Sequence, residues 1–237
     1  MGSYYTKERL YREAHKLKET LGYRVDEIGF DIECRCNEVG IKTEHVPFHT
    51  KGLRGMAIPG SNRACDIILL SSSRTCIEQN FDCGHEVIHL GLHRGLNRKT
   101  FNCLEKVYAN QDTFIEWQAN EGAAEMFIPY KVLLPIVRER YQYFASSDDI
   151  KCFKKETAAL FKVSGVVMEY RFESLKYEIY QYINGVPLND IAIKSVSQQR
   201  KEKINVSSLN DLENKQIKKE EVILSSNKFI NFESVFI

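Results

Sequence analysis

The first forty residues carry apolar positions at helical spacing. Residues 6–21 repeat an apolar side chain every three or four positions, and Gly22 follows as a stop signal. A second amphipathic stretch places apolar residues on one stripe between residues 28 and 39, before Gly40. The pattern therefore predicts two N-terminal helices.

The next thirty residues change to the short, β-prone runs that are typical of a small sheet. Residues 43–49 predict a strand, and Pro47 ends it or places it at a sheet edge because proline lacks the amide hydrogen of the ladder. Residues 52–58 and 65–70 flank a stretch rich in turn-forming residues. These two runs predict a hairpin.

Helical spacing returns in the second half of the chain. Residues 73–91 and 111–127 predict two helices, and Pro129 closes the second because proline cannot continue a helix. Residues 153–162 and 166–182, separated by a short break, predict a helix-turn-helix-like pair. From residue 195 the composition turns to Lys, Glu, Ser, Asn and Gln, which predicts a polar tail that is mobile or loosely attached.

Composition restricts the classes of function. The chain has 237 residues with 33 Lys and Arg against 32 Asp and Glu, so its net charge is +1. The chain as a whole therefore lacks the excess of positive charge that drives non-specific binding to nucleic acid. No apolar run approaches the roughly 18 residues that cross a membrane. The seven cysteines are scattered, and no signal peptide precedes them, which predicts a reduced, cytoplasmic protein.

The segment His85-Glu86-Val87-Ile88-His89 carries the most specific chemistry. Residues four apart share a helix face, so both imidazoles can bind one zinc ion at about 2.0 to 2.1 Å. Zinc lowers the pKa of a bound water towards about 7, and Glu86 stands beside the two histidines as the base that accepts its proton. The motif predicts one catalytic Zn²⁺ in a hydrolase.

A catalytic zinc site takes three protein ligands, and Glu116 is the candidate for the third. It lies 27 residues after His89, which suffices to finish one helix and return antiparallel beside it. Asn120, one turn further on, is expected to hold Glu116 or a ligating histidine in place. Glu121 and Glu125 fall about 140° and 180° around that helix and are interpreted as solvated charges facing elsewhere.

Other polar residues near the motif have plainer interpretations beside the functional ones. His93 continues the spacing of four residues and is either a substitute ligand or, as we favour, a residue at the end of the helix that contacts a ligand or lies on the surface. Cys83 is interpreted as a core residue, because positions two apart on a helix point about 200° apart. Trp117 is interpreted as helix packing.

Two blocks, "FDCGHEVIHLGLH" and "EWQANEGAAEMFIP", carry a resemblance to a known family. They are similar to the ImmA/IrrE metallopeptidases of bacteria and phages, whose pattern is roughly HELGHxxxH followed by ExxANxFAAxxxMP. The resemblance covers about residues 1 to 185 in element order. By that resemblance His85, His89 and Glu116 bind the metal, Glu86 is the catalytic glutamate and Asn120 is the asparagine of the motif.

The resemblance implies an α+β fold. Its zincin-like metallopeptidase core has N-terminal helices, a small mixed sheet, the HExxH helix and the helix with the third ligand, and a helical extension follows the core. The corresponding domains are residues 1–130, 131–194 and, for the polar tail, 195–237. The chain departs from the family pattern at Ile88, where Gly is usual, and at Gly122, where Phe is usual. These departures concern packing and substrate preference more than the metal site.

An extended substrate is expected to pair with an exposed edge of the small sheet, because main-chain pairing aligns a peptide without demanding one sequence. We expect residues 65–71 to form this edge. The candidate residues for substrate binding or for stabilising the oxyanion are Ile67, Ile68, Leu69, Leu70, Tyr108 and His93.

The resemblance implies a zinc-dependent endopeptidase that cleaves a helix-turn-helix repressor and so derepresses a mobile element or a stress response. The alternative is a metal-containing regulator that binds the repressor or DNA without proteolysis. Direct DNA binding is disfavoured because the second helix of the 153–182 pair opens with Val166, Val167 and Met168 instead of side chains that read bases. The sequence leaves the oligomeric state open.

Overall fold

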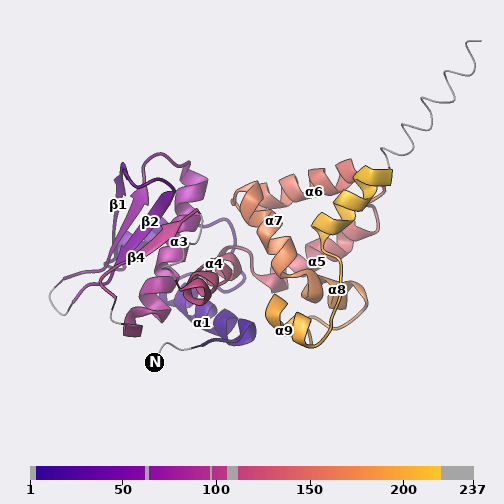
Figure 1. Cartoon of the computed structure of the whole chain (residues 1–237), viewed down its shortest axis with the longest axis horizontal. Coiled ribbons are helices and arrows are strands. Elements are labelled where there is room, and N and C mark those ends of the chain that lie inside the picture. Colours follow the sequence, from indigo (N-terminus) through magenta and orange to yellow (C-terminus); the bar gives the residue numbers. More distant parts are fainter. Residues whose placement is uncertain (1–3, 62–63, 97, 106–111, 220–237) are drawn as a thin grey trace, which may run out of the picture.

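The computed structural model describes residues 4–61, 64–96, 98–105 and 112–219. A small sheet and the first four helices form one side of the molecule in Figure 1, and the later helices form the other. The predicted α+β class with a helical extension is confirmed. In the part of the chain that is described, no helix combines the length and the apolar character that crossing a membrane requires.

The two predicted N-terminal helices are present as α1 (Lys7–Thr20) and α2 (Ile32–Glu38). The Thr6 side chain accepts a hydrogen bond from the amide of Arg9 and so fixes the start of α1. Asp31 does the same for α2 through the amide of Cys34. The second helix is shorter than predicted, because the residues before Asp31 form turns instead of a first helical turn.

The sheet has four strands in the order β1-β3-β2-β4. Their bounds are β1 (Lys42–Val46), β2 (Leu53–Ile58), β3 (Ile67–Ser71) and β4 (Phe101–Leu104). The predicted hairpin is confirmed, since β2 and β3 pair antiparallel. Strand β1 pairs parallel with β3, and β4 pairs antiparallel with β2. The sheet is therefore mixed, and β4 is a strand that the sequence pattern did not predict.

The prediction that residues 65–71 form an exposed edge is wrong. Strand β3 lies between β1 and β2, so both sides of its main chain are paired within the sheet. Of the residues proposed for substrate binding, Ile68 and Leu70 are buried in the core, and Ile67 and Leu69 face the other side of the sheet. The main chain of β3 is therefore not available to a substrate, and the edges of the described sheet are β1 and β4.

Helices α3 (Cys76–Leu92) and α4 (Thr113–Phe127) pack against each other, and α3 also covers one face of the sheet. Thr75 and Glu78 form a reciprocal capping box at the start of α3. Gly122 of α4 faces Ile88 of α3, and a Cβ at Gly122 would lie 3.0 Å from Ile88 Cδ1. Ile88 thus fills the space beside Gly122, so the two departures from the family pattern compensate each other in size.

In the region that the structure describes, the extension consists of helices and the loops that join them. Its elements are α5 (Tyr130–Tyr141), α6 (Ser147–Leu160), α7 (Gly165–Ser174), α8 (Lys176–Ile183) and α9 (Val196–Lys201). The single helix predicted over residues 166–182 is two helices that meet at Leu175. Residues 209–219 form a further helix, yellow in Figure 1, on which Leu209 is buried and Glu213 pairs with Lys154. The expected polar tail therefore contains packed helices.

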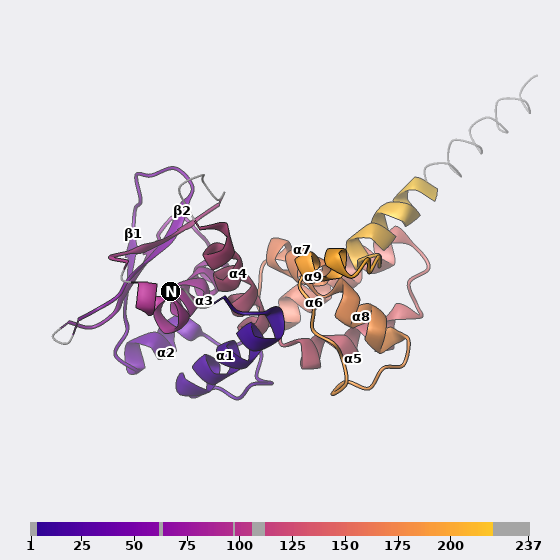
Figure 2. The same cartoon turned by 60° about the horizontal axis from the view of Figure 1, so that its bottom comes forward.

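Helix α4 lies between the sheet and the extension, as Figures 1 and 2 both show. The interpretation of Glu121 and Glu125 as solvated charges is wrong, because both side chains are buried at this junction. Arg171 of α7, also buried, donates from Nη1 to Glu121 Oε1 at 3.0 Å, and its Nη2 pairs with Glu125. The two carboxylates are charged residues of an internal interface.

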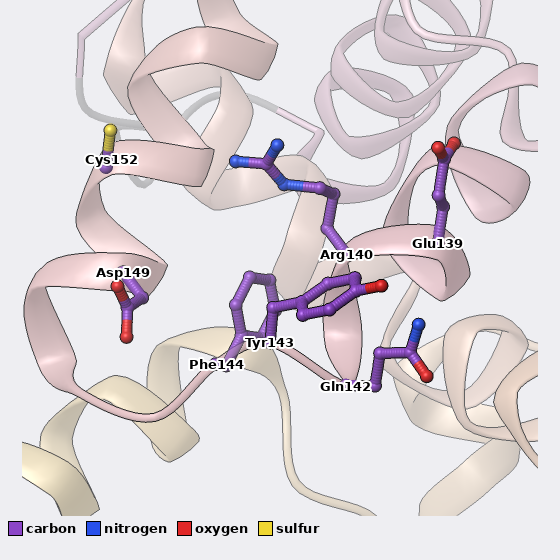
Figure 3. A pocket seen from close by; sticks show the side chains of 7 residues that line it. All are labelled: Glu139, Arg140, Gln142, Tyr143, Phe144, Asp149 and Cys152. Atoms are coloured by element: carbon purple, nitrogen blue, oxygen red, sulfur yellow. The ribbon is translucent and has the colours of Figure 1, made fainter.

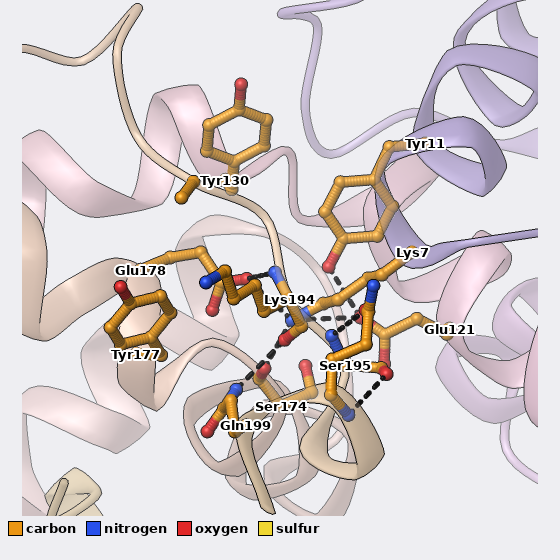
Figure 4. Close-up of polar contacts among 12 residues, drawn as sticks. Lys7, Tyr11, Glu121, Tyr130, Ser174, Tyr177, Glu178, Lys194, Ser195 and Gln199 are labelled. Atoms are coloured by element: carbon orange, nitrogen blue, oxygen red, sulfur yellow. Dashed lines mark hydrogen bonds and ion pairs between the residues drawn. The ribbon is translucent and has the colours of Figure 1, made fainter. Parts of the chain in front are cut away.

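A second cation completes this junction network, which we define as Lys7, Tyr11, Glu121, Glu125, Arg171 and Glu178. Lys7 Nζ donates to Glu178 Oε1 at 3.0 Å and lies 3.9 Å from Glu121 Oε1. Tyr11 Oη donates to Glu121 Oε1 at 2.5 Å. Figure 4 shows Lys7 and Tyr11 of α1 converging with Glu121 of α4 and Glu178 of α8. The junction network fastens the extension to the helices of the sheet side.

Candidate metal centre

Helix α3 presents His85 and His89 one turn apart, with their Nε2 atoms 3.1 Å from each other. Glu116 approaches from α4, with Oε2 3.5 Å from His85 Nε2 and Oε1 3.8 Å from His89 Nε2. All three side chains are buried. The structure thus brings together the three residues predicted to bind a metal, and their role as ligands stays a prediction.

Hydrogen bonds from α4 fix the tautomer of His85. Asn120 Nδ2 donates to the carbonyl oxygen of Glu116 at 3.0 Å, which leaves Asn120 Oδ1 as an acceptor 3.1 Å from His85 Nδ1. His85 therefore carries its proton on Nδ1, and the lone pair of Nε2 faces Glu116. A metal-binding histidine needs this arrangement, and Asn120 provides it from the position that the sequence predicted.

His93 performs the same task for His89. The Nε2 of His93 lies 2.9 Å from Gln118 Oε1, which can only accept, so His93 carries its proton there. The Nδ1 of a neutral His93, 2.9 Å from His89 Nδ1, is then an acceptor for the proton of His89. Burial lowers the pKa of His93 and lowers that of His89 to about 3, which favours the neutral forms. The lone pair of His89 Nε2 is left facing Glu116.

Substituting His93 by leucine is expected to weaken zinc binding by about 10–100-fold, because it removes the acceptor that orients His89. His93→Asn places a carbonyl oxygen near the position of Nδ1 and is expected to recover part of the affinity. Competition with a chelator of known affinity measures both variants. Equal affinities for the leucine and asparagine variants would contradict the orienting role.

Glu86 occupies a position that is unfavourable for a carboxylate without a nearby cation. Its side chain is 0 % exposed, and neither carboxylate oxygen has a hydrogen-bond partner among the residues described. Burial raises the pKa of Glu86 well above its usual range. It fits there because Gly55 of β2 has no side chain: a Cβ at Gly55 would lie 3.0 Å from Glu86 Oε1.

The electrostatics of the ligand set suit a divalent cation. The carboxylate oxygens of Glu116 face the Nε2 atoms of His85 and His89 at 3.5 and 3.8 Å. Two neutral imidazoles and one carboxylate are the donors that zinc takes in hydrolases. A cation held by them would also offset the cost of burying Glu86, so the residues present fit the metal.

Strand β4 completes the wall of the site. The ring of Phe101 stacks on His89 with centroids 4.7 Å apart, and Cys103, two residues on, also points inward. Sequence reasoning missed Phe101, Cys103 and Gln118 because no local pattern marks a four-residue strand or relates Gln118 to His93. Tyr108, proposed from the sequence to stabilise the oxyanion or bind substrate, lies outside the described residues.

The surface of the described residues has hollows away from this centre, two of which have volumes of about 500 and 490 Å³. One of about 500 Å³ is lined by Tyr5, Phe114, Trp117 and Arg200 among others, so Trp117 borders open space as well as packing against Phe114. The other, of about 490 Å³ and shown in Figure 3, lies where α5 leads into α6 and mixes charged with aromatic side chains. Neither is lined by the histidines or by Glu86.

Comparison with known families finds a match. The sequence model described as Peptidase_M78, IrrE N-terminal-like domain, matches residues 36–173, from α2 to α7. The matched region contains all four residues of the candidate centre and more than half of the chain. None of the curated proteins matches the chain.

Proposed function

Because the chain belongs to the Peptidase_M78 family, we propose that it is a zinc-dependent endopeptidase that cleaves a partner protein. The observation that carries the proposal is the unpartnered carboxylate of Glu86 beside the buried cluster of His85, His89 and Glu116. A metal site that only stabilises a fold does not need an additional carboxylate beside its ligands. The position of Glu86 therefore favours an enzyme over a regulator that binds without cutting.

His85, His89 and Glu116 would hold the metal through their inward-facing donor atoms. Bound there, zinc supplies Lewis-acid chemistry, which activates water and polarises a peptide carbonyl. Asn120 and His93 keep the two imidazoles neutral and aimed inward. The stacked ring of Phe101 limits the rotation of His89 and excludes water from that side.

Glu86 is the proton carrier of the proposed reaction. It accepts a proton from the attacking water and returns it to the nitrogen of the leaving amine. A carboxylate with an ordinary pKa binds a proton only weakly at neutral pH. Burial raises the pKa of Glu86 and so increases its affinity for a proton. The raised pKa brings Glu86 nearer to the range in which it can both take and release the proton.

Strand β4 is the proposed edge for substrate pairing, in place of the strand that the sequence suggested. It has a partner on one side only, β2, within the described sheet. Its residue Phe101 contacts His89, so a peptide added along β4 would run beside the metal centre. Pairing through the main chain would hold the scissile bond without strict demands on sequence.

The proposed substrate is a helix-turn-helix repressor, whose cleavage would derepress a mobile element or a stress response. This choice rests on the resemblance in the two motif blocks, and two features of the chain support it. The net charge of +1 offers no strong attraction to DNA. In α7, Arg171 is buried in the junction network, so it cannot read bases, and Val166 at the helix start is exposed.

Incubating the purified protein with a purified helix-turn-helix repressor, taken from beside its gene where one is encoded there, tests this function. We expect cleavage at one bond, identified by mass spectrometry of the fragments. A chelator should abolish the cleavage and added zinc should restore it. Cleavage that persists without metal would overturn the metallopeptidase mechanism. If the repressor stays intact while the protein cleaves other protein substrates, only the choice of substrate is overturned.

A further inference from the structure

A second group of metal-binding side chains shares His85 with the first. The donor atoms of His85, Glu86 and Cys103 all lie within 4.8 Å of one another, and each of these side chains is at most 1 % exposed. The sulfur comes from β4 and the other two donors come from α3. We call this set the sulfur triad, and the set of His85, His89 and Glu116 the histidine triad.

The sheet register brings the sulfur to Glu86. Cys103 is the partner of Gly55 in the β2–β4 ladder, and Gly55 is the residue over which the Glu86 carboxylate lies. The two oxygens of Glu86 have no hydrogen-bond partner in the described chain. Buried carboxylates are normally paired, so these oxygens are suited to bind a cation.

Charge and softness favour one class of cation for the sulfur triad. A divalent ion there would be neutralised by the Glu86 carboxylate and the Cys103 thiolate, whereas the histidine triad contributes only one carboxylate. Thiolate ligands also select soft metals. Burial raises the pKa of the Cys103 thiol, and Arg54 Nη2, which donates to Cys103 Sγ at 2.9 Å, offsets only part of this rise, so an incoming cation must displace the thiol proton. Asp82 lies 3.7 Å from Arg54 Nη1 and balances its charge.

We propose that the sulfur triad is an alternative site for a thiophilic divalent cation such as Cd²⁺, exclusive with the histidine triad because both need His85. On binding, the thiol of Cys103 loses its proton to solvent and a metal–sulfur bond forms. Glu86 becomes a ligand and can no longer accept a proton. Binding of the cation is inferred from the side chains alone. The loss of cleavage that would follow from it depends on the proposed peptidase function.

Titration of the metal-free protein with Cd²⁺ tests the proposal through the ultraviolet absorption of the cadmium–thiolate bond. The wild type is expected to develop this band and to saturate at about one ion per chain, since His85 is shared. Cys103→Ala should lose the band, and Glu116→Gln should keep it, because Glu116 belongs only to the histidine triad.

Cys83→Ala is the matched control for a buried cysteine on the same side of the molecule. The sulfur of Cys83 lies 3.9 Å from that of Cys36, and this pair takes no part in the sulfur triad. The control is expected to keep the band. A band of unchanged strength in Cys103→Ala, or one that disappears in Cys83→Ala or Glu116→Gln, would overturn the assignment.

Glu86→Gln gives a measurement that does not depend on replacing the cysteine. An amide is a poorer ligand than a carboxylate, so the affinity for Cd²⁺ is expected to fall by at least about tenfold while the band remains at saturation. An unchanged affinity would mean that Glu86 is not a ligand. These readouts need no substrate, so they stand or fail independently of the peptidase activity.

Discussion

Glu86→Gln is expected to lower the rate of substrate cleavage by about 10²–10⁴-fold while the protein keeps its zinc. The amide has nearly the shape of the carboxyl group but cannot accept and return a proton. It also fits the cavity beside Gly55, and no hydrogen bond within the described chain is lost. Cleavage assays combined with metal analysis of the purified variant separate lost chemistry from lost metal.

Glu78→Gln is the matched control, since it makes the same substitution in the same helix. Glu78 belongs to the capping box of α3, and glutamine serves at that position as well. Its cleavage rate is expected to equal that of the wild type. A Glu86→Gln variant that cleaves at the wild-type rate with full zinc would show that another group moves the proton.

Arg171→Met is expected to lower the free energy of unfolding by about 3–5 kcal/mol. The substitution removes the hydrogen bonds and ion pairs that Arg171 makes with Glu121 and Glu125, and the two carboxylates stay buried with too little positive charge. The guanidinium also donates from Nε to the carbonyl oxygen of Ile128 at 3.0 Å. Unfolding in urea, followed by circular dichroism, measures the loss.

Two further variants show whether the loss comes from the buried charges. Arg140→Met breaks an exposed ion pair, in which Arg140 Nη2 lies 3.2 Å from Glu156, and it is expected to cost at most about 1 kcal/mol. Adding Glu125→Gln to Arg171→Met should recover part of the lost stability, because a neutral amide is cheaper to bury. Equal losses for the Arg171 and Arg140 variants would contradict the role of the junction network.

The parts of the fold that could be predicted from the sequence depend on local interactions. Helix α1 begins at Lys7 because Thr6 caps it, and α4 ends near Pro129 because proline breaks the pattern. The β2–β3 hairpin follows from two β-prone runs around one turn-rich loop. The histidine pair of the candidate centre was predictable for the same reason, since the helical repeat places His85 and His89 on one face, and Glu116 was predicted from its place on the following helix.

The parts that could not be predicted depend on contacts between distant residues. The parallel pairing of β1 with β3 places residue 42 opposite residue 67, and nothing in either run shows it. That pairing is why the expected substrate edge was wrong. Glu121 and Glu125 have the pattern of surface charges, and only Arg171, about fifty residues later, shows why they are buried.

The junction network has a consequence for how members of such a family can diverge. Its charges come from three separate stretches of the chain, α1, α4 and α7–α8, and each is buried against a charge from another stretch. A chimera that took its extension from a relative would bury mismatched charges unless α1 and α4 were transplanted with it. The extension and the helix bearing Glu116 are therefore expected to be inherited as one unit.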